Sequence, residues 1–140
     1  KMHNAATLAG MAFANAFLGI NHSLAHKIGG EYHVPHGRAN AILMPYVIRY
    51  NGTKPEKPGV WPKYNYYKAD EKYCELARLI GLKFNTTEEG VEAFAKACAD
   101  LGKTVGIKMS FKEQGIDPLK WESTLERMFL TPDPQAKHHY

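Results

Sequence analysis

The segment from Met2 to Ala25 contains no aspartate, glutamate, lysine or arginine, and this lack of charge limits the possible folds more than any other feature. A charge-free stretch of this length is typical of a membrane-spanning helix or of a helix buried inside protein. This stretch also carries three asparagines and two histidines, which are costly to transfer into lipid. We therefore expect a helix buried in protein and no membrane partner. Since Lys1 leads straight into the segment without a signal-peptide pattern, we expect the chain to begin inside a longer protein.

The composition suits a single globular domain or a piece of one, because 44% of the 140 residues are apolar and 11% are aromatic. The formal net charge is +4, and no run of like charge forms a patch that would bind nucleic acid. Cys74 and Cys98 lack CxxC spacing and fall in helix-like stretches. We therefore expect free thiols in a reducing cytoplasm and no disulfide framework.

Apolar periodicity predicts helices along most of the chain, and no stretch is convincing as a strand or as an internal repeat. The expected fold class is therefore all-α. The expected helices cover 4–20, a short segment from 21 that gives way to a loop by 37, 38–50, 69–80, 87–104, a short segment from 110 to about 115, and a last segment to about 129. An aromatic-rich loop with several prolines is expected at 51–67.

Local signals predict some of the helix ends. Thr86 and Glu89 have the spacing of a capping box, which predicts that the helix 87–104 begins there. Asn4 is a candidate N-cap for the first helix, because its side chain can accept a bond from a free backbone N–H. Pro45 lacks a backbone N–H, so it predicts a kink or a break in the helix around it.

The chemistry-bearing residues are concentrated in a histidine cluster, since four of the seven histidines lie within 15 residues at His22, His26, His33 and His36. Imidazole is the commonest metal ligand in proteins. His22 and His26 are four residues apart, so on a helix their rings share a face and could chelate one ion, with His36 joining from the following loop. Zinc and ferrous iron both suit nitrogen ligands. The alternative is a set of polar residues at a helix end with no metal.

The spacing around these histidines resembles the iron-containing alcohol dehydrogenase family. That family carries the pattern Gly-x-x-His-x-x-x-His-x-x-Gly-x-x-x-x-x-Pro-His-Gly, and every fixed position is filled here, by Gly19, His22, His26, Gly29, Pro35, His36 and Gly37. The flanking segments 9–15 and 39–51 agree with the family as well. The segment 63–73 is most similar to the alcohol dehydrogenase half of the bifunctional aldehyde/alcohol dehydrogenases, and the resemblance extends from residue 1 to about 129.

This resemblance implies a fold and a domain. Residues 1–140 are then a fragment of the helical metal-binding domain, the C-terminal region of a dehydroquinate synthase-like fold, without its N-terminal α/β nucleotide-binding domain. The tail 130–140 departs from the ending that the family often shows. On its own, such a fragment should expose apolar surface where the missing domain packs.

The resemblance also implies residue roles and a reaction. His22 and His36 are expected to bind Fe²⁺, with Zn²⁺ as a possible substitute, whereas His26 is expected beside the nicotinamide of NAD, in the proton route to the alcohol oxygen. Phe13 lies either near the nicotinamide or in the core, and His33 matches no fixed position. The implied reaction interconverts primary alcohols and aldehydes of the ethanol and acetaldehyde type.

The family completes its metal site with an aspartate and a histidine four residues apart, and no Asp-x-x-x-His occurs in this chain. The fragment alone is therefore expected to be inactive. Two alternatives stay open from the sequence. One is a non-catalytic helical assembly module that uses the loop 53–67 as a contact surface, since the resembling bifunctional enzymes form homo-oligomers and filaments. The other is a simple metal-binding protein that uses His22, His26 and His36.

Overall fold

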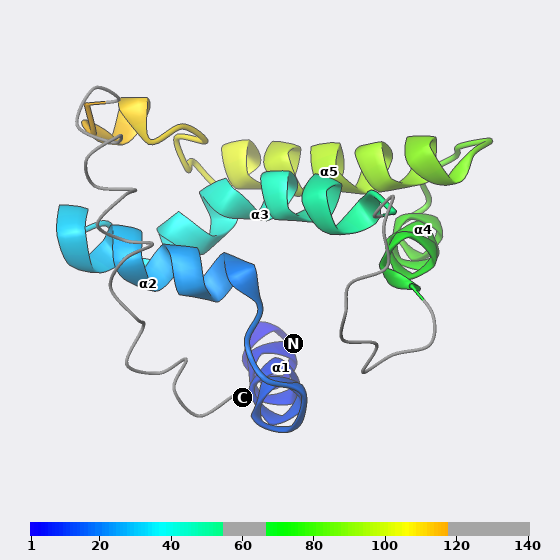
Figure 1. Ribbon diagram of the computed structural model, residues 1–140, viewed down its shortest axis with the longest axis horizontal. Helices are drawn as coiled ribbons and strands as arrows, with labels where there is room; N and C mark the ends of the chain where they lie inside the picture. Colours follow the sequence, from blue (N-terminus) through cyan, green and yellow to red (C-terminus); the bar gives the residue numbers. More distant parts are fainter. Residues whose placement is uncertain (55–66, 118–140) are drawn as a thin grey trace.

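The computed structural model describes residues 1–54 and 67–117, and these two ranges contain helices and no strand. In chain order the helices are α1 Met2–Ala16, α2 Ile20–Tyr32, α3 His36–Gly52, α4 Ala69–Leu79, α5 Thr87–Thr104 and the 3₁₀ helix η1 Lys112–Gln114 (Figure 1). The all-α fold class is confirmed. Most of the aromatic-rich loop expected at 51–67, the helix expected to end near 129 and the tail 130–140 lie outside the described residues.

Helix α3 is the central element, because α2, α4 and α5 all pack against it. Figure 1 shows α3 and α5 side by side, with α2 beside the first half of α3 and α4 near its other end. One buried apolar cluster joins α2 to the first half of α3 and includes Ala25, Ile28, Val34, Ala39, Leu43 and Ile116. A second cluster joins the last half of α3 to α5 and includes Ile48, Val91 and Ala95.

The helix α5 begins and ends where the sequence predicts. The side chain of Thr86 accepts a hydrogen bond from the backbone N–H of Glu89 at 3.2 Å, and the Glu89 carboxylate accepts one from the backbone N–H of Thr86 at 3.4 Å. These two bonds satisfy N–H groups that the first turn of a helix leaves free, so the capping box is confirmed. Acidic residues in the first turn and Lys103 in the last turn also complement the helix dipole.

Helix α3 differs from its prediction, because it runs from His36 to Gly52 without ending at Pro45. The break expected as one alternative is therefore wrong, and the kink expected as the other stays a prediction. Pro45 is buried, and this burial offsets the hydrogen bond that the residue cannot donate. At the end of the helix, the Thr53 hydroxyl donates to the carbonyl of Arg49 at 2.9 Å.

Helix α1 also differs from its prediction, because none of its residues is buried. It begins at Met2, with Lys1 as an N-cap that makes no side-chain bond, so Asn4 lies inside the helix and is not its cap. Met2 and Leu8 are 83% and 66% exposed. The burial expected for the charge-free segment is therefore not provided to its α1 part by the described residues. None of the helices in these ranges has the length and apolar character required to cross a bilayer.

The segment after α5 forms one short helical turn. The predicted short helix after residue 110 is the single 3₁₀ turn η1, and it ends at Gly115 with a φ of 87°. A left-handed φ of this kind favours glycine, which explains why the turn stops there. Ile116 then enters the cluster between α2 and α3, so this segment closes one end of the molecule.

Candidate metal centre

Three of the predicted site histidines lie together in the structure. His22 and His26 are one turn apart on α2, and His36 is the first residue of α3 rather than part of a loop. The ring centroids of His22 and His36 are 5.3 Å apart, those of His26 and His36 are 4.7 Å apart, and those of His22 and His26 are 6.3 Å apart. The spacing predicted a shared face for the first two rings, and the turn between the helices brings the third ring to them.

The turn between α2 and α3 depends on backbone conformation. His33 ends α2 in the left-handed region, with φ 55° and ψ 30°, and Pro35 then precedes the first residue of α3. A Cβ atom added at Gly29 would lie 3.1 Å from the carbonyl oxygen of Val34, so this close approach favours glycine. His33 itself is exposed.

Small and apolar residues beneath the rings hold α2 against α3. Ala25 and Ala39 are fully buried, and Ile28 is 2% exposed. Alanine at these positions lets the two helix backbones approach closely, which brings His36 within reach of the α2 histidines. The rings themselves lie nearer the surface, since His22 and His26 are half-buried and His36 is exposed.

The electrostatics around His22 favour its neutral imidazole form. Burial lowers the pKa of His22 below its ordinary value, and the neighbouring imidazoles of His36 and His26 lower it further. A neutral ring has a free nitrogen lone pair, which is the form that binds a metal ion. The donor set therefore suits ferrous iron or zinc in charge and in chemistry.

The described residues supply only part of a metal site. In residues 1–54 and 67–117, no three or more histidine, cysteine, aspartate or glutamate side chains are placed to hold an ion together. The three rings are close, but they do not converge as a complete set of ligands. This observation weighs against a self-sufficient site made of His22, His26 and His36.

Phe13 does not join the histidine cluster in this structure. It lies on α1, its side chain is half exposed, and none of the ring contacts among the described residues links it to a histidine. Within the described part of the chain Phe13 is not in a core, because α1 contributes no buried residue, and its burial in a longer protein stays untested. Its expected place near a nicotinamide stays a prediction.

Two asparagines that the sequence patterns did not predict lie next to the site. Asn40 is 8% exposed, lies one turn after His36 and contacts that ring, while Asn21 bonds to Asn40 from α2. Their positions in the sequence could have suggested them, because Asn21 directly precedes His22 and Asn40 follows His36 by four residues. Their meeting depends on the packing of α2 against α3, which a local pattern does not encode.

Comparisons with known proteins agree with the resemblance noted in the sequence. A model of the Fe-containing alcohol dehydrogenase family, C-terminal part, matches residues 1–131. An aldehyde-alcohol dehydrogenase of Streptococcus pneumoniae is 62% identical over 137 residues, which are 97% of this chain and 16% of that protein. The bifunctional aldehyde-alcohol dehydrogenase of Escherichia coli is 38% identical over 131 residues, 91% of this chain and 15% of that protein.

The solved structures agree in fold. An alcohol dehydrogenase from Oenococcus oeni superposes with a TM-score of 0.70 at 35% identity, and the match covers 87% of this chain and 29% of that one. A 1,3-propanediol oxidoreductase superposes with a TM-score of 0.68 at 32% identity, over 89% of this chain and 29% of that one. The described helices therefore match a helical region that makes up less than a third of these neighbours.

Proposed function

Because this chain belongs to the Fe-containing alcohol dehydrogenase family, we propose that it supplies one side of a metal centre at which a primary alcohol and an aldehyde are interconverted with NAD. The observation that carries the proposal is the meeting of three imidazoles from α2 and α3, with centroid separations of 4.7 to 6.3 Å. The names of the relatives support the substrate class, since they include aldehyde-alcohol dehydrogenases and a butanol dehydrogenase.

The residues present fit a divalent ion as part of its ligand set. His22 and His36 would hold Fe²⁺, or Zn²⁺ in its place, through neutral nitrogen atoms. The lowered pKa of His22 supports this assignment, because it favours the unprotonated ring, which is the form that binds a metal ion. The remaining ligands, an aspartate and a histidine by the family pattern, would come from protein outside this chain.

His26 has a different proposed role, the transfer of the substrate proton. Its ring lies 4.7 Å from that of His36, so it is next to a proposed ligand without being one. A histidine can accept or release a proton near neutral pH, which suits the exchange between an alcohol hydroxyl and solvent. A bound divalent ion would polarise the substrate oxygen, and NAD would exchange the hydride.

The charge-free segment 2–25 contributes an environment rather than a reactive group. Covered by the rest of a longer protein, it would exclude water from one side of the site and strengthen the electrostatic interactions within it. Phe13 would then lie near the nicotinamide ring. NAD is the proposed cofactor, although one relative is named as an NADPH-dependent enzyme.

Residues 1–140 would form part of the helical metal-binding domain of a longer cytoplasmic enzyme. The chain spans 16% of the S. pneumoniae relative and 29% of the solved neighbours, which supports this division. The full-length enzyme would act on small alcohols and aldehydes and assemble as a homo-oligomer. Residues 1–140 alone should reduce no acetaldehyde with NADH, and measurable turnover by the isolated chain would contradict this part of the proposal.

The metal assignment can be tested in a chimera in which this chain replaces the matching 137-residue segment of the S. pneumoniae relative. Purified chimera should contain about one iron per chain and should lose it in His22→Ala and in His36→Ala. His26→Ala should keep the iron and lower the rate of acetaldehyde reduction by about 10²- to 10⁴-fold.

His33→Ala is the matched control in this chimera, because it removes a nearby histidine that fills no fixed position of the family pattern. It should keep both the iron and the rate. Iron retained in both ligand variants would contradict the proposed ligands, and iron lost in His26→Ala would instead support a chelate between His22 and His26.

A further inference from the structure

We infer that Lys54 is an acylation site, at which loss of the charge on one exposed amine weakens the attachment of helix α4 to the end of α3. Lys54 lies two residues after the end of α3, and its Nζ atom lies 3.4 Å from Oδ2 of Asp70, the second residue of α4. The histidine cluster lies at the other end of α3, where His36 begins the helix. The Lys54 site is therefore separate from the proposed metal centre and stands independently of the proposed function.

The carboxylate of Asp70 is the buried half of this ion pair. Asp70 is 3% exposed, and it is the one charged residue that is buried within residues 1–54 and 67–117. Its Oδ1 atom accepts a hydrogen bond from the backbone N–H of Glu71 at 2.9 Å, whereas Oδ2 faces Lys54. A buried carboxylate needs opposite charge or hydrogen-bond donors in place of its lost hydration. Removing the cation from such a pair is therefore destabilising.

Lys54 is the accessible half of the pair, because its side chain is 67% exposed whereas that of Asp70 is 4% exposed. Lys54 lines an open cavity of about 410 Å³ at the end of α3, which also includes Thr53, Thr87 and Val91. A small molecule can therefore reach the Lys54 amine from solvent without a change in the fold. The carboxylate that depends on this amine stays covered.

The start of α4 has limited stabilisation besides this pair. Its N-cap residue, Lys68, makes no side-chain cap bond, and the helix packs more extensively on α5 than on α3. The N–H of Glu71 and the positive end of the helix dipole compensate part of the Asp70 charge. When the Lys54 charge is lost, we therefore expect α4 to loosen while the chain remains folded.

Acylation would remove the Lys54 charge in a reaction with an acyl phosphate. The neutral amine attacks the acyl carbonyl carbon, a carbon–nitrogen bond forms, and the bond from that carbon to the phosphate oxygen breaks. Phosphate leaves with the electron pair. The ammonium group gives up two protons in all, one to solvent and one to the departing phosphate, and no atom is oxidised or reduced. The product is a neutral amide, which cannot form an ion pair with Asp70.

Lys103 provides a matched comparison within the same chain. Its Nζ atom lies 3.6 Å from Oδ1 of Asp100, and the two side chains are 66% and 55% exposed. Because water hydrates the Asp100 carboxylate, loss of the Lys103 charge should have little effect. Lys54 and Lys103 are similarly exposed and both form ion pairs, so a difference between them would report the burial of the carboxylate.

Hydrogen exchange of the α4 amides in the 140-residue chain would measure how firmly the helix is attached. Lys54→Gln removes the charge and should speed this exchange by about 5- to 30-fold. Lys54→Arg, which keeps the charge, and Lys103→Gln should leave exchange within about twofold of wild type. In an Asp70→Asn background, Lys54→Gln should have no further effect, because no buried charge is left to compensate.

Acetyl phosphate would test the modification itself. After treatment, peptide mass spectrometry of the folded chain should find an acetyl group on Lys54. A chain with Nε-acetyllysine encoded at position 54 should exchange its α4 amides as fast as Lys54→Gln. Lys54 left unmodified in a sample in which Lys103 is acetylated would overturn the inference.

Three outcomes of the exchange experiment would also overturn it: unchanged exchange in Lys54→Gln, an equal effect of Lys103→Gln, or the same acceleration by Lys54→Gln in the Asp70→Asn background. If Asp70→Asn fails to fold, the comparison of Lys54→Gln with Lys54→Arg still decides, because only the first of these variants removes the charge.

Discussion

Helices α1 and α5 are of similar length, 15 and 18 residues, yet they differ in almost every source of stability. Helix α5 has a capping box, charges that complement its dipole, and a buried face that includes Val91 and Ala95. Helix α1 has no side-chain cap, no charged residue in its first or last turn, and no buried residue. The apolar face of α5 is covered by α3 and α4, whereas the described part of the chain does not cover α1.

This difference shows that the sequence of a helix predicts that the helix forms but does not predict which part of the protein packs against it. An amphipathic helix such as α5 encodes both its exposed face and its buried face. A helix without charges, such as α1, encodes only that it is to be buried. Since the chain spans 29% of its solved neighbours, we expect protein beyond these residues to provide that cover in the longer enzyme.

The largest expected effect compares a buried residue of the packed helices with an exposed residue of α1. Ile48 is 4% exposed, and Ile48→Ala should lower the free energy of unfolding by about 2–5 kcal/mol, because it leaves a cavity between α3 and α5. Met11 is 62% exposed, and Met11→Ala should change the same quantity by less than about 0.5 kcal/mol. Urea unfolding followed by circular dichroism would measure both free energies of unfolding. Equal losses in the two variants would show that α1 is packed as well as α3 and α5.

A pair of glycine substitutions should give effects of opposite sign. A Cβ atom at Gly90 in α5 would lie 2.5 Å from Cys74 Sγ and 2.7 Å from the Phe84 ring, and such overpacking costs about 1–3 kcal/mol. Gly90→Ala should therefore destabilise the chain despite the gain of about 1 kcal/mol in helix propensity. At Gly10 in α1 the nearest atom, on Phe13, is 4.0 Å away, so Gly10→Ala should increase helix content. A more stable Gly90→Ala variant would show that the α4–α5 contact is loose.

Two threonines test the difference in capping. Thr86→Ala should lower the free energy of unfolding by about 1 kcal/mol, because it removes the bond to the Glu89 N–H. Thr7 in α1 donates to the carbonyl of His3 at 3.1 Å, within the helix, so Thr7→Ala should leave stability unchanged or slightly raise helix content. Chemical unfolding of both variants in parallel would measure this, and equal losses would argue that the Thr86 cap contributes nothing of its own.

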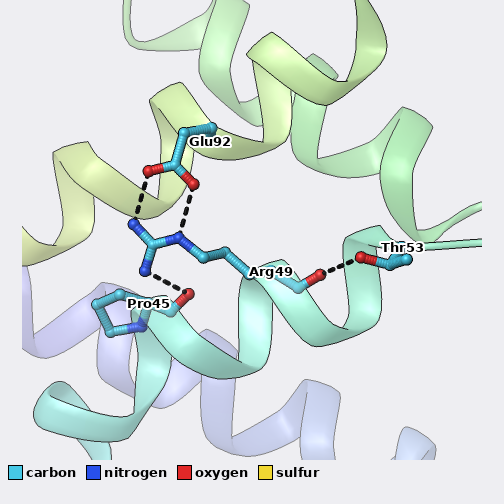
Figure 2. Close-up of polar contacts among 4 residues, drawn as sticks. All are labelled: Pro45, Arg49, Thr53 and Glu92. Atoms are coloured by element: carbon cyan, nitrogen blue, oxygen red, sulfur yellow. Dashed lines mark hydrogen bonds and ion pairs between the residues drawn. The ribbon is translucent and has the colours of Figure 1, made fainter.

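The smallest effect concerns the ion pair between α3 and α5. Arg49 donates to both carboxylate oxygens of Glu92, at 2.6 and 2.7 Å (Figure 2). The hydrogen bond from Arg49, aided by its charge, lowers the pKa of Glu92 below its ordinary value, against the opposing effect of burial. Both side chains are largely exposed, so the pair should contribute no more than about 1 kcal/mol.

The direction of the pH dependence follows from the lowered pKa. A carboxyl group whose pKa is lower in the folded state than in the unfolded state stabilises the fold. This contribution is fully present when the pH is above the unfolded-state pKa of about 4.3, and it is lost as the pH falls through the folded-state pKa. Glu92→Gln should therefore lower stability at neutral pH, and the difference from wild type should vanish in acid. A difference that persists at low pH would assign the effect to packing. Helix α1 has no acidic residue, so we expect it to contribute no comparable change of stability with pH in acid.

The features that sequence predicts well here are local ones. The helix 87–104 and its capping box depend on residues within a few positions of each other, and so does the shared face of His22 and His26. The position of His36 at the start of α3 was missed, because it depends on a left-handed conformation at His33 that non-glycine residues rarely adopt. The Asn21–Asn40 contact joins residues 19 apart and depends on how two helices pack.

The same distinction explains why the break expected at Pro45 is absent. A local rule predicts that proline breaks or kinks a helix, because it considers only the missing N–H group. In the structure the helix continues, because residues on both sides of Pro45 are held by different neighbours. Leu43 belongs to the cluster with α2, and Ile48 belongs to the cluster with α5.

Pro45 therefore lies at a boundary within α3, where the chain lacks one helical hydrogen bond and the packing partner changes. The half that carries His36 packs against α2, and the half that carries Ile48 packs against α5. A change at the α5 contact would therefore leave the packing around His36 in place. One continuous helix in this way joins two separately packed regions.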